Sequence, residues 1–165
     1  MLSLARNAHG GGNVSGRTGL TIARWVLVIL IGAWALNQLR SAFQVLVVML
    51  GDPAAAEIDP TFIVIVNNMS AFAVALTLAN AVCYTLTVAL LVLRASLALP
   101  VYAAALFFDL VGWVIYSSDS IYDFWAASNH EIADWVANGL LLVCLIGVIV
   151  LRQSGALPKS FRKAR

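Results

Sequence analysis

The sequence predicts an all-α integral membrane protein with four transmembrane helices in one bundle, and three features of the chain lead to this fold class. First, 62% of the 165 residues are hydrophobic and 11% are charged, whereas soluble domains have about 45–50% apolar and about 25% charged residues. Second, apolar runs long enough to cross a hydrocarbon core of roughly 30 Å occur four times. Third, the sign of the charges alternates from one connection to the next. One compact membrane domain is therefore expected.

The charged residues are segregated by sign. Basic residues lie before or at the start of the first span, between the second and third spans, and after the fourth: Arg6, Arg17, Arg24, Arg94, Arg152, Lys159, Arg162, Lys163 and Arg165. Apart from Asp109, the acids lie in the two other connections: Asp52, Glu57, Asp59, Asp119, Asp123, Glu131 and Asp134. Because Lys and Arg near span ends are retained in the cytoplasm, we expect both termini to be cytoplasmic. Four spans with short inner connections favour an up-down-up-down bundle, and we expect it to reside in the plasma (inner) membrane.

The predicted membrane domain covers residues 18–152, with spans at about 20–45, 69–94, 99–117 and 132–152. Residues 1–17 lack apolar periodicity and are rich in Gly, Ser and Asn, so we expect a flexible cytoplasmic tail. Residues 153–165 are expected to form a basic cytoplasmic tail. The third helix should begin at Pro100, and the fourth at a capping box formed by Ser128, Asn129, His130 and Glu131.

The first and second helices are expected to extend beyond the bilayer on the outer side. The first runs from Gly19 to Leu50, before Pro53, and would be about 48 Å long. The second has a start signal at Asp59-Pro60 and would continue to Arg94. Alternatively, residues 62–66 form a strand-like or interfacial piece and the helix begins after residue 68. In the first case, the apolar segments 42–48 and 62–66 would stand outside the bilayer core, where they could pack on each other, lie in the headgroup region or contact a partner.

A carboxylate lies near the middle of the third span. Asp109 is about ten residues from either end of that span, and an acid at this depth is normally turned into the bundle. The second span carries a polar stripe on one helical face at the same depth, so we expect Asp109 to hydrogen-bond to Asn80 or Tyr84. The predicted intramembrane polar cluster contains Asp109, Asn80, Tyr84, Thr77 and Tyr102.

This cluster has two interpretations. In one, a protonated Asp109 joins the helices structurally; in the other, it belongs to a proton or ion path. Asn37 and Arg40 of the first helix lie further out. Arg40 is expected either to anchor the outer interface or to pair with Asp109, and the first role is favoured because about seven residues of depth separate the two groups.

A second face of the second span carries small residues four apart, which allows close helix packing. Its members are Ala71, Ala75, Ala79 and Cys83. This face can contact a helix of the same bundle or of another subunit. Cys83 and Cys144 lie within spans, without CxxC spacing, and are interpreted as packing residues.

No metal site and no cofactor are expected. His130 and Asp134 have a spacing that can hold a metal, but helix capping and the helix dipole explain Glu131 and Asp134 better. No span offers a pair of histidines for a buried haem. GxSxG, Gly-rich phosphate-loop and HExxH motifs are absent from the sequence. Catalysis and nucleic-acid binding are therefore not expected.

The run from Ala23 to Leu27, followed by Gly32 and Leu39, resembles the first helix of small four-span DoxX-like membrane proteins. The resemblance covers about one span, and no function is carried across. Our leading hypothesis is a non-catalytic accessory or structural subunit of a larger membrane complex, with the lipid bilayer and another membrane protein or further copies of this chain as partners. The alternative is a small proton- or ion-coupled transporter or channel that uses Asp109.

Overall fold

A computed structural model describes residues 12–54, 56–117 and 131–157 of the chain. The regular elements within these ranges are all helices: α1 (Gly12–Leu50), α2 (Pro60–Asn68), α3 (Ala71–Val92), α4 (Ala98–Ser117) and α6 (Glu131–Gln153). Four of them, α1, α3, α4 and α6, are long and apolar enough to cross a membrane. The prediction of a helical protein with four such helices is therefore confirmed for the described residues.

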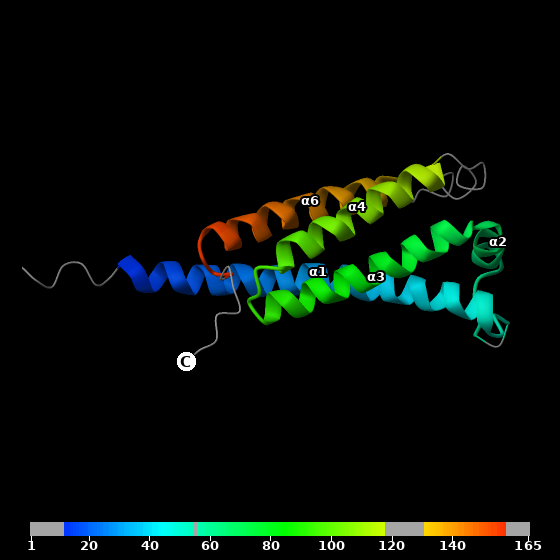
Figure 1. Ribbon diagram of the computed structural model, residues 1–165, viewed down its shortest axis with the longest axis horizontal. Coiled ribbons are helices and arrows are strands. Elements are labelled where there is room, and N and C mark those ends of the chain that lie inside the picture. Colours follow the sequence, from blue (N-terminus) through cyan, green and yellow to red (C-terminus); the bar gives the residue numbers. More distant parts are fainter. Residues whose placement is uncertain (1–11, 55, 118–130, 158–165) are drawn as a thin grey trace, which may run out of the picture.

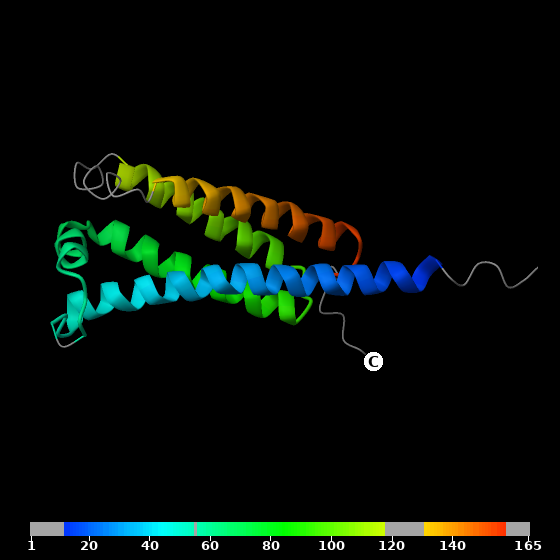
Figure 2. The same cartoon turned by 180° about the vertical axis from the view of Figure 1, so that it is seen from behind.

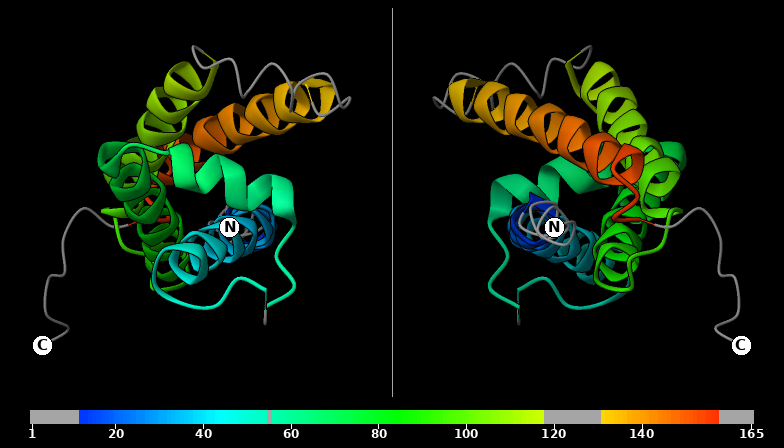
Figure 3. Two further views of the ribbon diagram at one scale, coloured as in Figure 1. Left: turned by 90° about the vertical axis from the view of Figure 1, so that its right-hand side faces the viewer. Right: turned by 90° about the vertical axis from the view of Figure 1, so that its left-hand side faces the viewer.

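The four long helices lie roughly along one axis, and successive helices run in opposite directions (Figure 1 and, from behind, Figure 2). The packing follows chain order, since α1 packs on α3, α3 on α4, α4 on α6, and α6 back on α1. The short helix α2 lies across one end of the bundle (Figure 3). We call this the α2 end. The opposite end, where α3 passes into α4 and where Arg24 of α1 contacts Val92, is called the Arg24 end.

Helix α1 is much longer than the other helices. Its 39 residues measure about 58 Å, whereas the 22 residues of α3 measure about 33 Å. From Arg24 to Leu50 the helix rises by about 39 Å, so it exceeds α3 slightly at the α2 end. The larger excess lies at the other end, because α1 begins at Gly12. Residues 12–17 are thus helical, although we expected them to belong to the tail.

The prediction of one continuous second helix from Pro60 to Arg94 is wrong. The chain is extended at Met69 and Ser70, and the Ser70 hydroxyl accepts a hydrogen bond from Ala73 N at 3.1 Å, which starts α3 as a new helix. The Asn68 side chain bonds back to Val64 O at 2.8 Å at the end of α2. Asparagine and serine favour such local bonds over helix continuation. The alternative start of the spanning helix after residue 68 is confirmed, but residues 62–66 are helical and not strand-like.

The predicted signals in the connection from α1 to α2 are present. Helix α1 ends at Leu50, one residue before Gly51. Asp59 is the N-cap of α2, Pro60 occupies the first helical turn, and the Asp59 carboxylate accepts hydrogen bonds from the backbone of Thr61 and Phe62. Two orphan N–H groups of the first turn are thereby satisfied.

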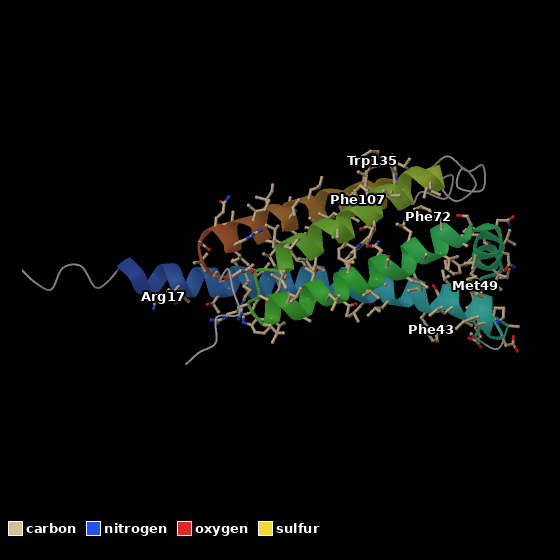
Figure 4. The ribbon with its side chains drawn as sticks, in the orientation of Figure 1. Arg17, Phe43, Met49, Phe72, Phe107 and Trp135 are labelled. Atoms are coloured by element: carbon tan, nitrogen blue, oxygen red, sulfur yellow. The ribbon has the colours of Figure 1, made fainter. Side chains whose placement is uncertain are left out.

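The buried side chains form two separate clusters. The larger lies toward the Arg24 end and draws on all four long helices; its fully buried members include Ile31, Tyr84, Leu91, Tyr102 and Val148. The smaller consists of Val45, Val66 and Val74, from α1, α2 and α3. Outside these clusters the surface is apolar: Figure 4 shows Phe43, Phe72 and Phe107 along the exterior, each more than half exposed. Such a surface suits lipid contact.

The first residues of the predicted basic tail, up to Leu157, return to the bundle and do not extend away from it. Gly155 is left-handed (φ 76°), Ala156 N bonds to Leu151 O at 3.0 Å, and Leu157 is fully buried in the large cluster. This is the usual C-terminal cap with a hydrophobic contact after it. The packed region therefore extends to Leu157, and the residues beyond it lie outside the described part.

Candidate functional site

The carboxylate of Asp109 accepts hydrogen bonds from two side chains of α3. Asn80 Nδ2 donates to Oδ1 of Asp109, and the Tyr84 hydroxyl donates to Oδ2. These are the two contacts that we expected from the polar stripe. They arise because Asn80 and Tyr84 are one helical turn apart on the buried face of α3, which packs directly on α4. Both oxygens of the acid are therefore held from the same neighbouring helix.

A third polar group at the site comes from α1 and was missed in the sequence. The indole of Trp34 lies close enough to interact with Asp109 and Tyr84. Its buried Nε1 does not reach hydrogen-bond geometry with any group of the described chain. A signal was available, because Trp34 is ten residues above Arg24 and so about 15 Å along the span, at the depth expected for Asp109. Three helices, α1, α3 and α4, thus meet at this carboxyl group.

Two buried polar atoms at the site have no partner within the described residues: Trp34 Nε1, which is a donor, and Asn80 Oδ1, which is an acceptor. Asn80 is only 6% exposed. Leaving such atoms unpaired in a low-dielectric interior costs free energy. One unpaired donor and one unpaired acceptor beside a carboxyl group are suited to hydrogen-bond a water molecule.

The site lies close to the middle of the bundle along its axis. Asp109 is about 16 Å from the first residue of α4 and about 12 Å from its last. For a hydrocarbon thickness of roughly 30 Å, this is near the midplane. Among the described residues, Asp109 forms no ion pair. It accepts the two hydrogen bonds from α3 and lies close to the indole of Trp34. The environment is thus polar but contains no basic side chain.

The hydroxyls of Tyr102 and Thr77, near this site, each donate a hydrogen bond to a backbone carbonyl. The rings of Tyr102 and Tyr84 are 5.9 Å apart at 70°. The Tyr102 hydroxyl turns to α6, where it donates to Leu141 O at 2.8 Å. The Thr77 hydroxyl donates to Ala73 O in its own helix at 3.0 Å. Tyr102 therefore connects the polar site to α6, whereas the Thr77 bond to Ala73 stays within α3.

Asn37 and Arg40 lie on the outside of the bundle. Both are exposed, together with Leu36 and Phe43 on the same side of α1. The buried side of α1 at this level carries Ala35, Ala42 and Val45 instead. Arg40 therefore does not pair with Asp109 in the described structure, which leaves the interface-anchor interpretation of this residue.

The small-residue face of α3 is only partly covered. Ala71 and Ala75 are exposed, whereas Ala79 and Cys83 are half-buried toward the Arg24 end. The face on which α3 packs carries Ala73, Val74, Asn80, Ala81 and Tyr84. Within one chain, Ala71 and Ala75 of the predicted small-residue face therefore do not take part in close helix packing.

The possible metal ligands His130 and Asp134 cannot be placed, because His130 and the side chain of Asp134 lie outside the described part of the chain. The predicted capping box before α6, which includes the side chain of Glu131, lies outside it as well. Within the described part, no group of three metal-ligating side chains comes together. The two cysteines, Cys83 and Cys144, are free.

No family model, no curated protein and no solved structure matches this chain. The interpretation of its function therefore rests on the geometry described above.

Proposed function

We propose that this protein is a non-catalytic subunit of a larger membrane complex, with both termini in the cytoplasm, an up-down-up-down topology, and residence in a plasma (inner) membrane. The orientation is supported by the basic residues at the Arg24 end and the acids at the α2 end. In this orientation the α2 end faces outward.

Asn37 carries this proposal. It is thirteen residues above Arg24, hence about 20 Å into a span of roughly 30 Å, and it is exposed on the exterior of the bundle. Polar side chains at this depth are normally turned into a protein interior, since lipid offers the amide no partner. Arg40, one turn further out, is exposed beside it. A protein neighbour along this side of α1 would give both groups a polar environment.

The apolar residues beside Asn37 support the same assignment. Leu36 and Phe43 are 69% and 64% exposed and flank the polar pair on α1. Leu50, at the end of α1, is 82% exposed and lies about 39 Å from Arg24, which is beyond the hydrocarbon thickness. An apolar surface that continues past the lipid suits a partner protein better than the bilayer alone.

The test is to substitute Asn37→Leu and to purify the protein in mild detergent at natural abundance, with native mass spectrometry of the complex. Leucine suits a lipid-facing position, so the isolated chain should remain folded. Interhelical amide bonds contribute about 0.6–2 kcal/mol in membranes, so the complex should weaken by roughly 3- to 30-fold. Thr85→Val is the matched control, because Thr85 is also exposed within a span but its hydroxyl donates to Ala81 O at 2.8 Å in its own helix.

A complex that persists unchanged in Asn37→Leu, or a wild-type protein that is a monomer at natural abundance, contradicts the proposal. Loss of the complex in the Thr85→Val control would mean that any change of the exterior is harmful, and would also count against a specific role for Asn37.

A second function, proton or ion coupling at Asp109, is favoured by the unpaired Asn80 Oδ1 and Trp34 Nε1 beside the carboxyl group. The test is proton flux into liposomes. If Asp109 titrates during transport, Asp109→Asn should reduce the flux at least about tenfold, since the amide cannot exchange a proton. Thr87→Val is the control, because Thr87 is buried nearby on α3 and satisfied within that helix. Flux at the wild-type rate in Asp109→Asn excludes this function.

A further inference from the structure

Two arginines meet at the Arg24 end of the bundle. Arg24 of α1 is only 6% exposed, and its Nη1 donates to Val92 O near the end of α3 at 3.4 Å. The guanidinium of Arg94, in the connection from α3 to α4, lies close enough to repel that of Arg24 electrostatically. Each guanidinium has five N–H donors, and the Val92 bond uses one of those of Arg24.

The described chain provides no full negative charge to balance this pair. The acid that is nearest along α4 is Asp109, about 16 Å from the start of that helix. Asp52, Glu57 and Asp59 belong to the connection at the α2 end. The carbonyl end of α3 supplies only about half a negative charge. Two positive charges therefore face one partial negative charge, an arrangement that favours binding of an anion.

The backbone at Arg94 adds a second observation. Arg94 adopts a left-handed conformation (φ 57°) and caps α3, with Ala95 N bonded to Leu90 O at 2.8 Å. Glycine is the residue that suits this position best. An arginine here is unfavourable for the backbone, whereas its side chain brings a second positive charge beside Arg24. The backbone cost is explained if the guanidinium binds a ligand.

Exposed apolar residues lie close to the two arginines along the chain. Leu93 and Leu97 are 67% and 51% exposed on either side of Arg94. The ring of Trp25 is 46% exposed and lies 5.1 Å from the Arg24 guanidinium carbon. A ligand at this position therefore meets both cationic donors and a hydrophobic surface. Arginine binds phosphate oxygens through paired N–H donors.

We propose that Arg24 and Arg94 bind the phosphate group of an anionic phospholipid, whose acyl chains lie against Trp25, Leu93 and Leu97. The site is at the end of the spans where basic residues collect, which is where phosphate headgroups of a cytoplasmic leaflet are found. The arginines would bind the phosphate group of either a lipid or a soluble phosphate ester. The exposed apolar residues beside them favour the lipid.

The experiment uses the purified full chain in mild detergent with equimolar phosphatidylglycerol and phosphatidylcholine, followed by native mass spectrometry. The wild type should retain phosphatidylglycerol preferentially. Arg94→Gly should reduce that retention about fivefold, the usual effect of one basic residue at an anionic lipid surface. Because glycine suits the left-handed backbone, this variant should unfold in phosphatidylcholine micelles at the wild-type temperature or above it, which separates binding from folding.

Arg17→Ala is the matched control. Arg17 is an exposed arginine on the part of α1 that projects past the other helices (Figure 4), so this variant should retain phosphatidylglycerol as the wild type does. Equal retention by Arg94→Gly and wild type, or equal losses in Arg94→Gly and Arg17→Ala, overturns the proposal. Displacement of the lipid by millimolar glycerol 3-phosphate would overturn the lipid assignment and would assign the site to a soluble phosphate instead.

Discussion

The two halves of the bundle are packed differently. Toward the Arg24 end, all four long helices contribute to one core, in which Leu91, Tyr102 and Val148 are fully buried. Toward the α2 end, the core consists of three valines from α1, α2 and α3. On α6, Trp135 is 60% exposed there, and its ring contacts that of Trp113 on α4. The first half is a four-helix core, whereas the second is an open arrangement closed by α2.

A single helix illustrates how this difference arises. On α6, a Cβ added at Gly147 would lie 3.0 Å from both methyl groups of Leu27 on α1, whereas a Cβ added at Gly139 would meet nothing within 4 Å. Gly147 thus allows α6 to approach α1 closely, as small residues do in membrane bundles. Toward the α2 end, α6 and α1 diverge (Figure 1). The Asp109 site lies where the tight half passes into the open half.

The largest expected effect comes from filling the close contact. Gly147→Leu should destabilise the bundle by about 1–3 kcal/mol, because a large side chain would overlap Leu27 and separate α6 from α1. Gly139→Leu should change stability by less than about 0.5 kcal/mol, the usual range for an exposed position. The measurement is unfolding of each variant in mixed micelles, followed by circular dichroism.

The two glycine variants have the same change in composition and lie on the same helix, so each controls for the other. Equal destabilisation by both substitutions would contradict the difference between the two halves. Little effect from either would mean that α6 contributes no close packing in the membrane.

A smaller effect is expected at Tyr102, whose hydroxyl links α4 to α6 in the tight half. Tyr102→Phe should cost about 0.5–1.5 kcal/mol and should loosen α6 locally. Cys144 is 1% exposed and near this hydroxyl, so its labelling by a membrane-permeant maleimide should become faster. Cys83 on α3 serves as the internal reference. Unchanged labelling of Cys144, or equal acceleration at Cys83, would show that the bond does not hold α6 in particular.

The sequence predicts the polar site better than it predicts which side of a helix is covered. Asn80 and Asn37 are both amides within apolar spans, yet one is buried against Asp109 and the other is exposed. Asn80 shares a helical face with Tyr84, so periodicity revealed its orientation. Asn37 has apolar residues and Arg40 around it, and its orientation depends on how α1 packs against three other helices. That packing is a tertiary property that local spacing does not contain.

The helix ends show the same distinction. Asp59-Pro60 and the end of α1 at Leu50 were predictable, because caps and proline act locally. The break at Met69 and Ser70 does not follow from the sequence alone, because apolar residues on both sides are compatible with one continuous helix or with two separate pieces. The fold of α2 back onto Val45 decides between them, and this contact joins residues distant in the sequence.

The smallest expected effect concerns the open half alone and depends on pH. Hydrogen bonds from Thr61 and Phe62, chiefly the backbone N–H of Thr61 at 2.7 Å, lower the pKa of Asp59 below its ordinary value of 3.8. A lowered pKa in the folded state means that the carboxylate stabilises α2 above the ordinary value, and that this contribution is lost as pH falls through the lowered pKa. Hydrogen-exchange protection of α2 should therefore decrease below about pH 4, while the core around Tyr102 keeps its protection.

Asp59→Asn separates the cap from its charge, because asparagine caps helices about as well as aspartate but does not titrate. Protection of α2 in this variant should be independent of pH between about 3 and 7. If the wild type loses protection in both halves together on acidification, the bundle opens as one cooperative unit, and the difference between the tight and open halves does not extend to their stability. If α2 alone responds, the open half has a separate local equilibrium, as expected for a helix held by one small cluster and one charged cap.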